Sequence, residues 1–139
     1  MTALDLDRVM ELQRRAFTHP WTTEMVKKEL TQEWSTVLLA EENGKLLGIS
    51  IFWLVHDELH LLNIATDPDH RQQGVARALL EATLAGGRAH KCRIATLEVR
   101  RGNGPALALY KNHGFRPVGL RPNYYTDDRE DAVVMIKDF

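Results

Sequence analysis

Cysteine is almost absent from this sequence, because Cys92 is the only one among 139 residues. A single cysteine cannot form an internal disulfide, and its isolation suits a reducing compartment. Glycine and proline are sparse as well, at 9 and 5 residues, which excludes collagen-like and low-complexity chains. No run of residues approaches the roughly 20 apolar positions of a membrane-spanning helix, and the acidic N-terminus lacks the apolar core of a secretion signal. We therefore expect a cytoplasmic protein with no membrane partner.

A surplus of positive charge is also missing. The chain has 18 Lys and Arg against 19 Asp and Glu, which gives a formal net charge of -1 and a pI near 6.6. Nucleic-acid-binding domains usually have a pI above about 9 or a dense basic stripe, so we expect no direct contact with nucleic acid. The length predicts one domain over residues 1–139, with a core that needs no metal or disulfide. We expect a monomer or a weak dimer.

Apolar periodicity and turn signals predict the secondary structure. Helices are expected over residues 6–17, from 23, over 71–89 and from 104, and strands over 36–40, 46–54, 59–66, 94–99, 115–120 and 132–136. Asp5, Thr22 and Asn103 stand where helix N-caps are needed, and the long helix is expected to end around Gly86 and Gly87. Because helices alternate with strands only in the second half, this order predicts an α/β fold with a mixed sheet and helices on both faces.

The segment from Leu61 to Ala76 reads LLNIATDPDHRQQGVA and carries the strongest functional signal. It predicts a strand, a turn and a helix start, a junction that aims unpaired backbone N–H groups at one point. Gly74 near the helix start would let a phosphate approach the backbone closely. A glycine at this position also serves simple packing, so local chemistry alone leaves both interpretations open.

The sequence RQQGVA at 71–76 fits the pattern Q/R-x-x-G-x-G/A of the GNAT acetyltransferases, and the order of elements is similar to theirs. Three further blocks resemble the RimI group of ribosomal-protein-alanine N-acetyltransferases. They are HPW at 19–21, LEVR at 97–100 with Asn103 and ALY at 108–110, and RPNYY at 121–125 with REDA at 129–132. The resemblance implies a mostly antiparallel sheet of six to seven strands flanked by about four helices. The usual first strand is expected to be short or missing, because only four residues precede Asp5.

The resemblance also implies that acetyl-CoA is the cosubstrate and that no metal takes part. The pyrophosphate of acetyl-CoA is expected at the segment Arg71, Gln72, Gln73, Gly74, Val75 and Ala76. The pantetheine arm is expected along a strand whose backbone N–H groups would polarise the thioester carbonyl, namely Asn63, Ile64, Ala65 and Thr66. Asn103 is expected to cap its helix and to contact the cosubstrate as well.

Acetyl transfer to an amine needs a base for the amine and a proton or hydrogen-bond donor for the leaving thiolate. The resemblance implies Glu98 as the base, acting directly or through a water, and Tyr110 as the acid. Two plainer interpretations stand beside these roles. Glu98 pairs with Arg93 or Arg100 in one, and Tyr110 is a core residue of its helix in the other.

An α-amine with a pKa of about 7.7 to 8.0 is far easier to deprotonate than a lysine at about 10.4, so a modest base favours an N-terminal acceptor. The resemblance implies the N-terminal alanine of small-subunit ribosomal protein number eighteen. The residues expected to contact this peptide are Trp21, Tyr124, Tyr125, Asp128 and Glu130. The acidic run from Asp127 to Asp131 is expected to favour a basic residue behind the amine. A GNAT enzyme for lysine or a small amine, and a non-catalytic acyl-CoA-binding module, are the alternatives.

Two other chemistries find little support in the sequence. His56 and His60 would lie roughly 13 Å apart on a strand, and no set of Cys or carboxylate residues completes a tetrahedral metal site. Cys92 has no partnering base that would make it an acyl-accepting nucleophile. We therefore expect direct transfer in a ternary complex.

Overall fold

The computed structural model describes residues 2–125 and 128–139. Four α-helices lie in these ranges, namely α1 (Leu6–Ala16), α2 (Thr23–Leu30), α3 (Val75–Ala89) and α4 (Gly104–Asn112). Six strands accompany them, namely β1 (Ser35–Glu42), β2 (Lys45–Val55), β3 (Glu58–Thr66), β4 (Ile94–Arg100), β5 (Arg116–Arg121) and β6 (Ala132–Asp138). Short 3-10 turns at Ala3–Asp5 and Pro68–His70 precede α1 and follow β3.

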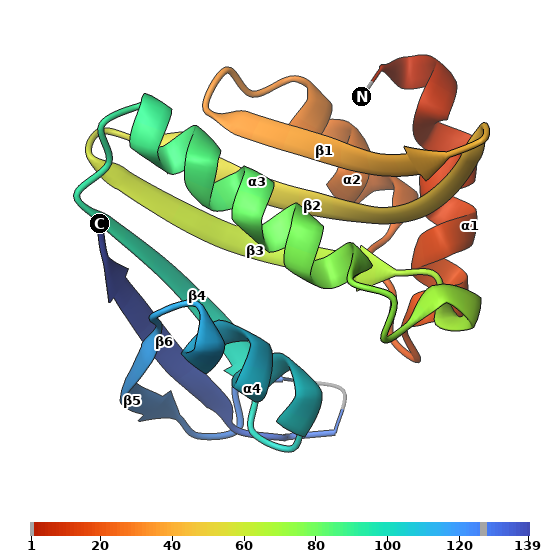
Figure 1. Ribbon diagram of the computed structural model, residues 1–139. Coiled ribbons are helices and arrows are strands. Elements are labelled where there is room, and N and C mark those ends of the chain that lie inside the picture. Colours follow the sequence, from red (N-terminus) through yellow and green to blue (C-terminus); the bar gives the residue numbers. More distant parts are fainter. Residues whose placement is uncertain (1, 126–127) are drawn as a thin grey trace.

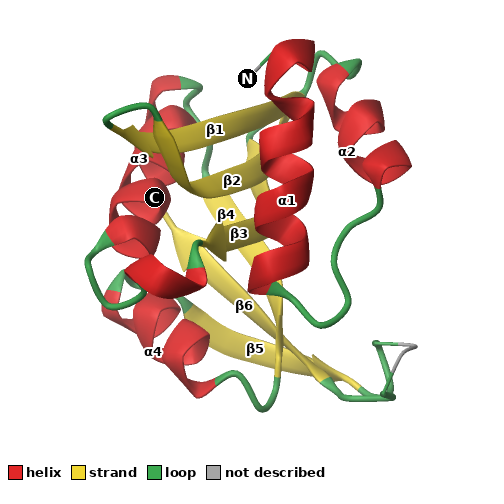
Figure 2. Ribbon diagram, turned by 90° about the vertical axis from the view of Figure 1, so that its right-hand side faces the viewer, coloured by secondary structure: helices red, strands yellow, loops and turns green. Residues whose placement is uncertain are grey.

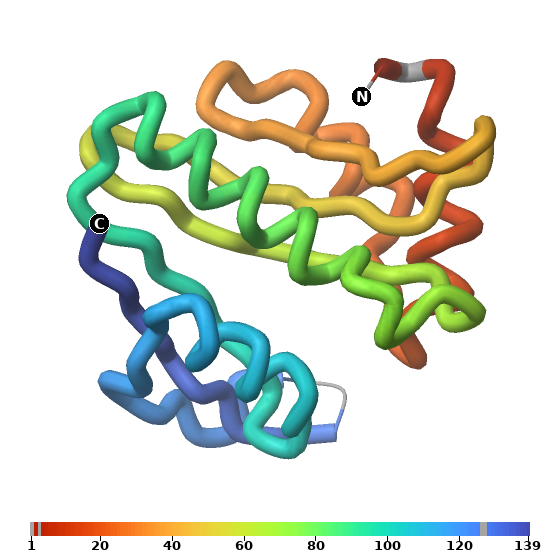
Figure 3. The backbone as a smooth tube through the Cα atoms, viewed as in Figure 1, coloured from red at the N-terminus to blue at the C-terminus, as the bar shows by residue number. Residues whose placement is uncertain are grey.

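The strands form one sheet in the order β1-β2-β3-β4-β6-β5, and only the β3–β4 pair is parallel (Figure 1). Helices α1 and α2 cover one face, while α3 and α4 cover the other (Figure 2). The chain follows β1 to β3 as a meander before α3 returns across β2 and β3 (Figure 3). These findings confirm the predicted mixed, mostly antiparallel sheet with helices on both faces, and within residues 2–125 and 128–139 no strand precedes α1.

The core is divided by the sheet into two apolar clusters. On the α1 and α2 side the cluster is built around Val9, Val26, Ile49 and Ile51. On the α3 and α4 side it contains Leu80, Leu84, Leu97, Val99, Tyr110 and Met135. Burial on both faces explains the continuous apolar run of β2, which the sequence showed between the two turns.

Two helix caps were predicted correctly and one was not. Thr22 Oγ1 accepts a hydrogen bond from Met25 N at 3.2 Å, and Asn103 Oδ1 accepts one from Ala106 N at 3.2 Å. Asp5 occupies the N-cap position of α1, but its carboxylate makes no cap bond. It accepts instead from Thr2 N at 2.9 Å and from Arg8 Nη2 at 2.6 Å.

The predicted start of the long helix was wrong, whereas its predicted extent to about residue 89 is confirmed. Helix α3 begins at Val75 rather than residue 71, because Gln72 and Gly74 have left-handed φ angles of 64° and 82° that no helix accommodates. Gly86 and Gly87, the region at which the helix was expected to stop, lie inside its last turn. Packing explains the second glycine, because a Cβ on Gly87 would lie 2.8 Å from Leu59 Cδ1 and 2.7 Å from Phe139 Cζ.

A glycine on β2 sets how closely α3 packs on the sheet. A Cβ on Gly48 would lie 2.9 Å from Val75 Cγ1 and Leu79 Cδ1, and 2.8 Å from the carbonyl oxygen of Ala65. Real Cβ atoms do not approach other atoms this closely. Gly48 therefore allows the first turns of α3 to lie directly against β2 and the end of β3.

The end of α1 is fastened to the loop after β3 by charged groups. Arg15 donates from Nη1 to Asp67 Oδ2 and from Nη2 to Asp69 Oδ2, both at 2.8 Å. Asp67 is 1% exposed, and its Oδ1 accepts from Asp69 N at 2.9 Å. Arg71 Nη2 donates to the carbonyl oxygen of Ala16 at 3.2 Å. These contacts fix the segment between β3 and α3 against α1.

We predict that Gly48→Ala destabilises the protein by about 1–3 kcal/mol, because the new methyl group has no room against α3. The control is Gly104→Ala, where no neighbouring atom lies within 4 Å of the added Cβ and little change is expected. Urea unfolding followed by circular dichroism measures both variants. Equal midpoints for the two variants would contradict this account of the packing of α3.

We predict that Asp67→Asn lowers the melting temperature most at neutral pH and least below about pH 4. Burial alone would raise the pKa of Asp67, but the Asp69 N–H and the Arg15 guanidinium outweigh it and hold the pKa below its usual range. Stability from such a carboxylate is present above the unfolded-state pKa and is lost as the pH falls through the folded-state pKa. The control is Asp69→Asn, whose side chain is 73% exposed and should matter less. A constant difference from pH 3 to 7 would refute this role of Asp67.

Candidate active site

Strands β3 and β4 separate halfway along their length. Their parallel pairing covers only Glu58–Leu61 and Ile94–Leu97. Among the described residues, no β4 partner follows Leu61, whereas β4 continues to pair with β6 as far as Arg100. The strands diverge beyond this point (Figure 1). The edge of β3 from Leu62 to Thr66 thus presents backbone groups with no partner on β4, a natural edge for an extended ligand.

A β-bulge changes the direction of this part of β3. In the pairing with β2, Ile51 lies opposite Asn63 and Phe52 lies opposite Leu61, so Leu62 is an extra residue. The bulge stands immediately before the four strand residues predicted to bind the pantetheine arm. The structure therefore places Asn63, Ile64, Ala65 and Thr66 along the unpaired edge, although the sequence could not reveal the bulge.

The side chain of Asn63 is engaged on the α1 face. Its Oδ1 accepts from Gln13 Nε2 at 2.9 Å, and Gln13 Oε1 accepts from Trp21 N at 3.4 Å. Gln13 is fully buried. It ties β3 to the segment between α1 and α2, and sequence reasoning missed it. The sequence did contain a signal for this role, because Gln13 is a polar residue four positions after Val9 and therefore falls on the apolar face of α1.

The start of α3 has the features of an anion site. Gly74 is the N-cap residue, and no side chain in the described part of the chain caps the helix. A Cβ placed on Gly74 would meet no atom within 4 Å, so the space before the helix is open. The first N–H groups of α3 point into this space together with the positive end of the helix dipole. The geometry of Gly74 to Ala76 therefore fits a phosphate group, whereas Arg71 contacts α1.

The candidate base Glu98 lies on the α1 and α2 side of the sheet. Leu97 and Val99 are buried in the cluster on the other side, so the intervening side chain points away from them. Glu98 is 30% exposed, and its Oε1 lies 3.2 Å from Arg121 Nη2. The two predicted alternative partners were wrong. Arg93 binds Asp57 at 3.1 Å, and Arg100 binds carboxylates of the loop between β5 and β6.

The two tyrosines of that loop lie beside Glu98 and Arg100. A hydrogen bond that Tyr124 donates to Glu98 raises the pKa of the Tyr124 hydroxyl. The rings of Tyr124 and Tyr125 meet edge to face at 5.2 Å, and Arg100 Cζ lies 4.0 Å from the centre of the Tyr125 ring. The tyrosines therefore connect the candidate base to Arg100.

The candidate acid Tyr110 is buried in the cluster below α4. Its ring packs edge to face with Phe115 at 5.8 Å. Burial raises the pKa of Tyr110 to about 12, with a smaller contribution from Tyr125. Tyr110 is thus a core residue that also lies near the tyrosine loop, and its role as the acid stays a prediction.

The acidic residues of the loop are held within the chain. Arg100 Nη1 donates to both Asp128 oxygens at 2.9 Å and to Glu130 Oε1 at 3.4 Å. Glu130 Oε2 also accepts from Gly102 N at 2.7 Å. A peptide cation could pair with these carboxylates only in competition with Arg100. Asp127 lies outside the described residues.

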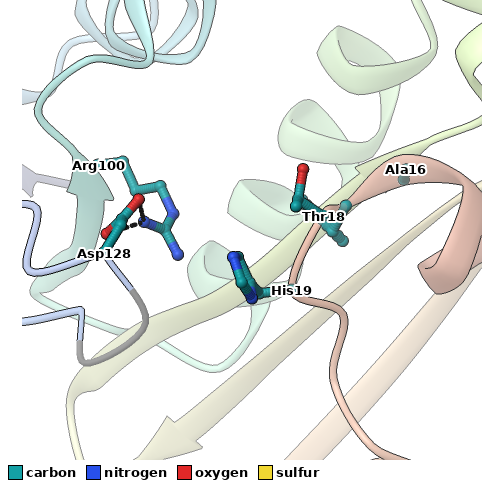
Figure 4. Close-up of a pocket in the computed structure, with 6 residues that line it drawn as sticks. Ala16, Thr18, His19, Arg100 and Asp128 are labelled. Atoms are coloured by element: carbon teal, nitrogen blue, oxygen red, sulfur yellow. Dashed lines mark hydrogen bonds and ion pairs between the residues drawn. The ribbon is translucent and has the colours of Figure 1, made fainter.

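A cavity of about 330 Å³ opens between the segment after α1 and the end of β4 (Figure 4). Its lining consists of Ala16, Phe17, Thr18, His19, Arg100 and Asp128. Thr18 and His19 were not singled out for acceptor binding from sequence. Trp21 was singled out, and its half-buried side chain packs against the cluster on the α1 and α2 side of the sheet.

The structure describes the residues considered for other chemistries. His56 lies in the turn after β2 with a φ of 53°, which corrects its expected strand context, and His60 lies on β3. Over residues 2–125 and 128–139, no three His, Cys, Asp or Glu side chains are grouped to hold a metal. Cys92 is buried, and burial raises the pKa of its thiol. No helix within the same ranges is long and apolar enough to cross a membrane.

Comparison with known proteins extends this picture. Residues 6–115 match the Acetyltransferase (GNAT) family. The putative ribosomal protein bS18-alanine N-acetyltransferase of Bacillus subtilis is 38% identical over 132 residues, which cover 94% of this chain and 87% of the relative. The ribosomal protein bS18-alanine N-acetyltransferase of Escherichia coli K12 is 39% identical over 135 residues, covering 94% and 89%.

A solved structure agrees with the sequence relatives. The crystal structure of the ribosomal-protein-S18-alanine N-acetyltransferase from Escherichia coli superposes with a TM-score of 0.93 at 36% identity, and the match covers 99% of this chain and 90% of that one. Because the family match spans more than half of the sequence and the fold agrees with it, the chain belongs to the acetyltransferase (GNAT) family.

Proposed function

We propose that this enzyme transfers the acetyl group of acetyl-CoA to the N-terminal alanine of ribosomal protein bS18. One observation carries the chemistry: Glu98 lies just beyond the point where β3 and β4 stop pairing. A thioester held along the unpaired edge of β3 therefore reaches an amine beside Glu98. The acceptor is proposed from the names of the relatives that are 38% and 39% identical.

The donor site uses backbone groups more than side chains. The N–H groups at the start of α3 bind the pyrophosphate of acetyl-CoA, and Gly74 provides the open approach. The backbone of Asn63 to Thr66 pairs with the pantetheine arm, and an N–H group in this stretch polarises the thioester carbonyl. Asn103, which caps α4, contacts the cosubstrate from the other side of the diverging strands.

The transfer step is direct attack in a ternary complex. The acceptor nitrogen loses a proton to Glu98, through a water, and forms a bond to the carbonyl carbon while the carbon–sulfur bond breaks. Tyr110 donates a hydrogen bond to the departing sulfur. Its pKa of about 12 exceeds that of a thiol by roughly 3.5 units, so full proton transfer is uphill by about 5 kcal/mol. The coenzyme A thiolate therefore leaves stabilised by Tyr110 and takes its proton from solvent.

The acceptor amine suits a base of ordinary strength. Deprotonating an α-amine at neutral pH takes roughly 3 to 4 kcal/mol less than deprotonating a lysine. The cavity beside Arg100 receives the residues that follow the acceptor alanine, and Tyr125, whose ring stacks on Arg100, lies behind this side of the cavity with Tyr124. An acetyltransferase for lysine or small amines would have the same donor site. Only the identity of the acetylated amine therefore distinguishes that function from N-terminal acetylation.

We predict that Glu98→Gln lowers kcat for a peptide with a free N-terminal alanine by at least about 100-fold, because the amine loses its base. Binding of acetyl-CoA, measured by calorimetry, should be unchanged. The control is Glu58→Gln, which removes a carboxylate whose ion-pair partner among the described residues is His60 of the same strand, and this variant should retain activity. Full activity in Glu98→Gln would remove the proposed base.

We predict that Tyr110→Phe lowers kcat by about 10- to 100-fold, because the leaving sulfur loses a hydrogen bond. The loss should shrink with an acetyl thioester of a more acidic thiol, which needs less stabilisation. The melting temperature should change little, since the ring contact with Phe115 remains. An equal loss of kcat with acetyl-CoA and with the thioester of the more acidic thiol would leave Tyr110 only a packing role.

A further inference from the structure

Arg121 reaches the candidate base from two strands away. It lies on β5 opposite Ala132 of β6, and Ala132 in turn lies opposite Arg100 of β4. Ala132 is fully buried and has only a methyl side chain, so the arginine can cross β6 and bring Nη2 to 3.2 Å from Glu98 Oε1. Its Cζ also lies 5.6 Å from the centre of the Tyr124 ring.

The charges around Glu98 divide into two groups. Arg100 is neutralised by Asp128 and Glu130 and stacks on Tyr125. Glu98 is the only carboxylate of the described residues within ion-pair distance of Arg121, which is 58% exposed. Tyr124 and Tyr125 of the described loop residues interact electrostatically with Glu98, and His19 lines the neighbouring cavity opposite Arg100. Arg121 is therefore the cation that shares this carboxylate with an incoming amine.

An acceptor amine must approach the same carboxylate to be deprotonated. A guanidinium and an ammonium that both contact Glu98 lie roughly 4–6 Å apart, a separation at which like charges disfavour the charged form. A neutral amine escapes this repulsion. An α-amine is about a tenth neutral at pH 7, whereas a lysine is neutral only a few times in ten thousand.

We propose that Arg121 determines acceptor specificity: held beside Glu98, its charge favours an amine that arrives neutral and disfavours one that stays cationic, such as lysine. This inference rests on the proposed function of Glu98 as the base. It differs from a structural role for Arg121, because the effect depends on the charge of the side chain and not on its shape.

The test compares Arg121→Gln with Arg121→Lys, which keeps the charge. The matched control is Arg116→Gln, which removes an arginine of the same strand that pairs with Asp138. In Arg121→Gln, the acid limb of kcat against pH should move up by about 0.5 to 1 pH unit. The ratio of kcat/KM for an N-terminal alanine peptide to that for an N-terminally blocked lysine peptide should fall about 3- to 10-fold. Arg121→Lys and Arg116→Gln should retain both wild-type values.

A binding measurement separates this inference from the proposed function. Calorimetry of the alanine peptide without acetyl-CoA, from pH 6 to 9, should show wild-type affinity rising as the amine loses its proton. In Arg121→Gln this rise should be reduced by a factor of about 3 or more. Absence of turnover in the wild-type enzyme would overturn the proposed function but leave this binding arm as a test. Identical pH profiles and acceptor ratios for Arg121→Gln and wild type, or equal losses in Arg121→Gln and Arg121→Lys, would overturn the role of Arg121.

Discussion

The short parallel pairing between β3 and β4 is the constraint on which the rest of the site depends. Four residues of each strand are joined, and the strands then diverge while β4 remains bound to β6. The bulge at Leu62 falls at the point of separation and turns the following residues of β3. This leaves the unpaired edge of β3 on one side and the Glu98 carboxylate on the other. A longer pairing between β3 and β4 would cover both the edge of β3 and the space beside Glu98.

Contacts from α1 connect the donor and acceptor sides of this opening. Arg15 binds the buried Asp67 in the segment that leads to α3, while Arg71 holds the last carbonyl of the helix. Gln13 joins Asn63 to the backbone of Trp21. The same helix therefore positions the residues proposed to bind acetyl-CoA and the chain segment that lines the cavity beside Arg100. A change in α1 should affect both substrates, even though none of these contacts takes part in the reaction.

Patterns of neighbouring residues predicted most of the fold. The features that they missed depend on contacts between residues that are distant along the chain. Turn residues, caps and apolar periodicity located the strands and the caps at Thr22 and Asn103, and the motif containing Gly74 identified the family. The sequence could not show that β3 bulges at Leu62 or that Glu98 pairs with Arg121. It also could not show that Gly87 lies inside a helix, at a position where Phe139 leaves no room for a side chain. Each depends on a partner distant along the chain. The lining of the cavity beside Arg100 was the least predictable feature, because its residues come from segments distant along the chain.

The most direct test of the account is the position of the acetyl group on a peptide that offers both a free N-terminal alanine and an internal lysine. The peptide is incubated with the enzyme and acetyl-CoA near pH 7, and tandem mass spectrometry locates the modification. The account predicts acetylation of the α-amine, because a base of ordinary strength deprotonates it far more readily than lysine. Acetylation of the lysine alone would contradict the proposed acceptor while leaving the acetyltransferase fold unaffected.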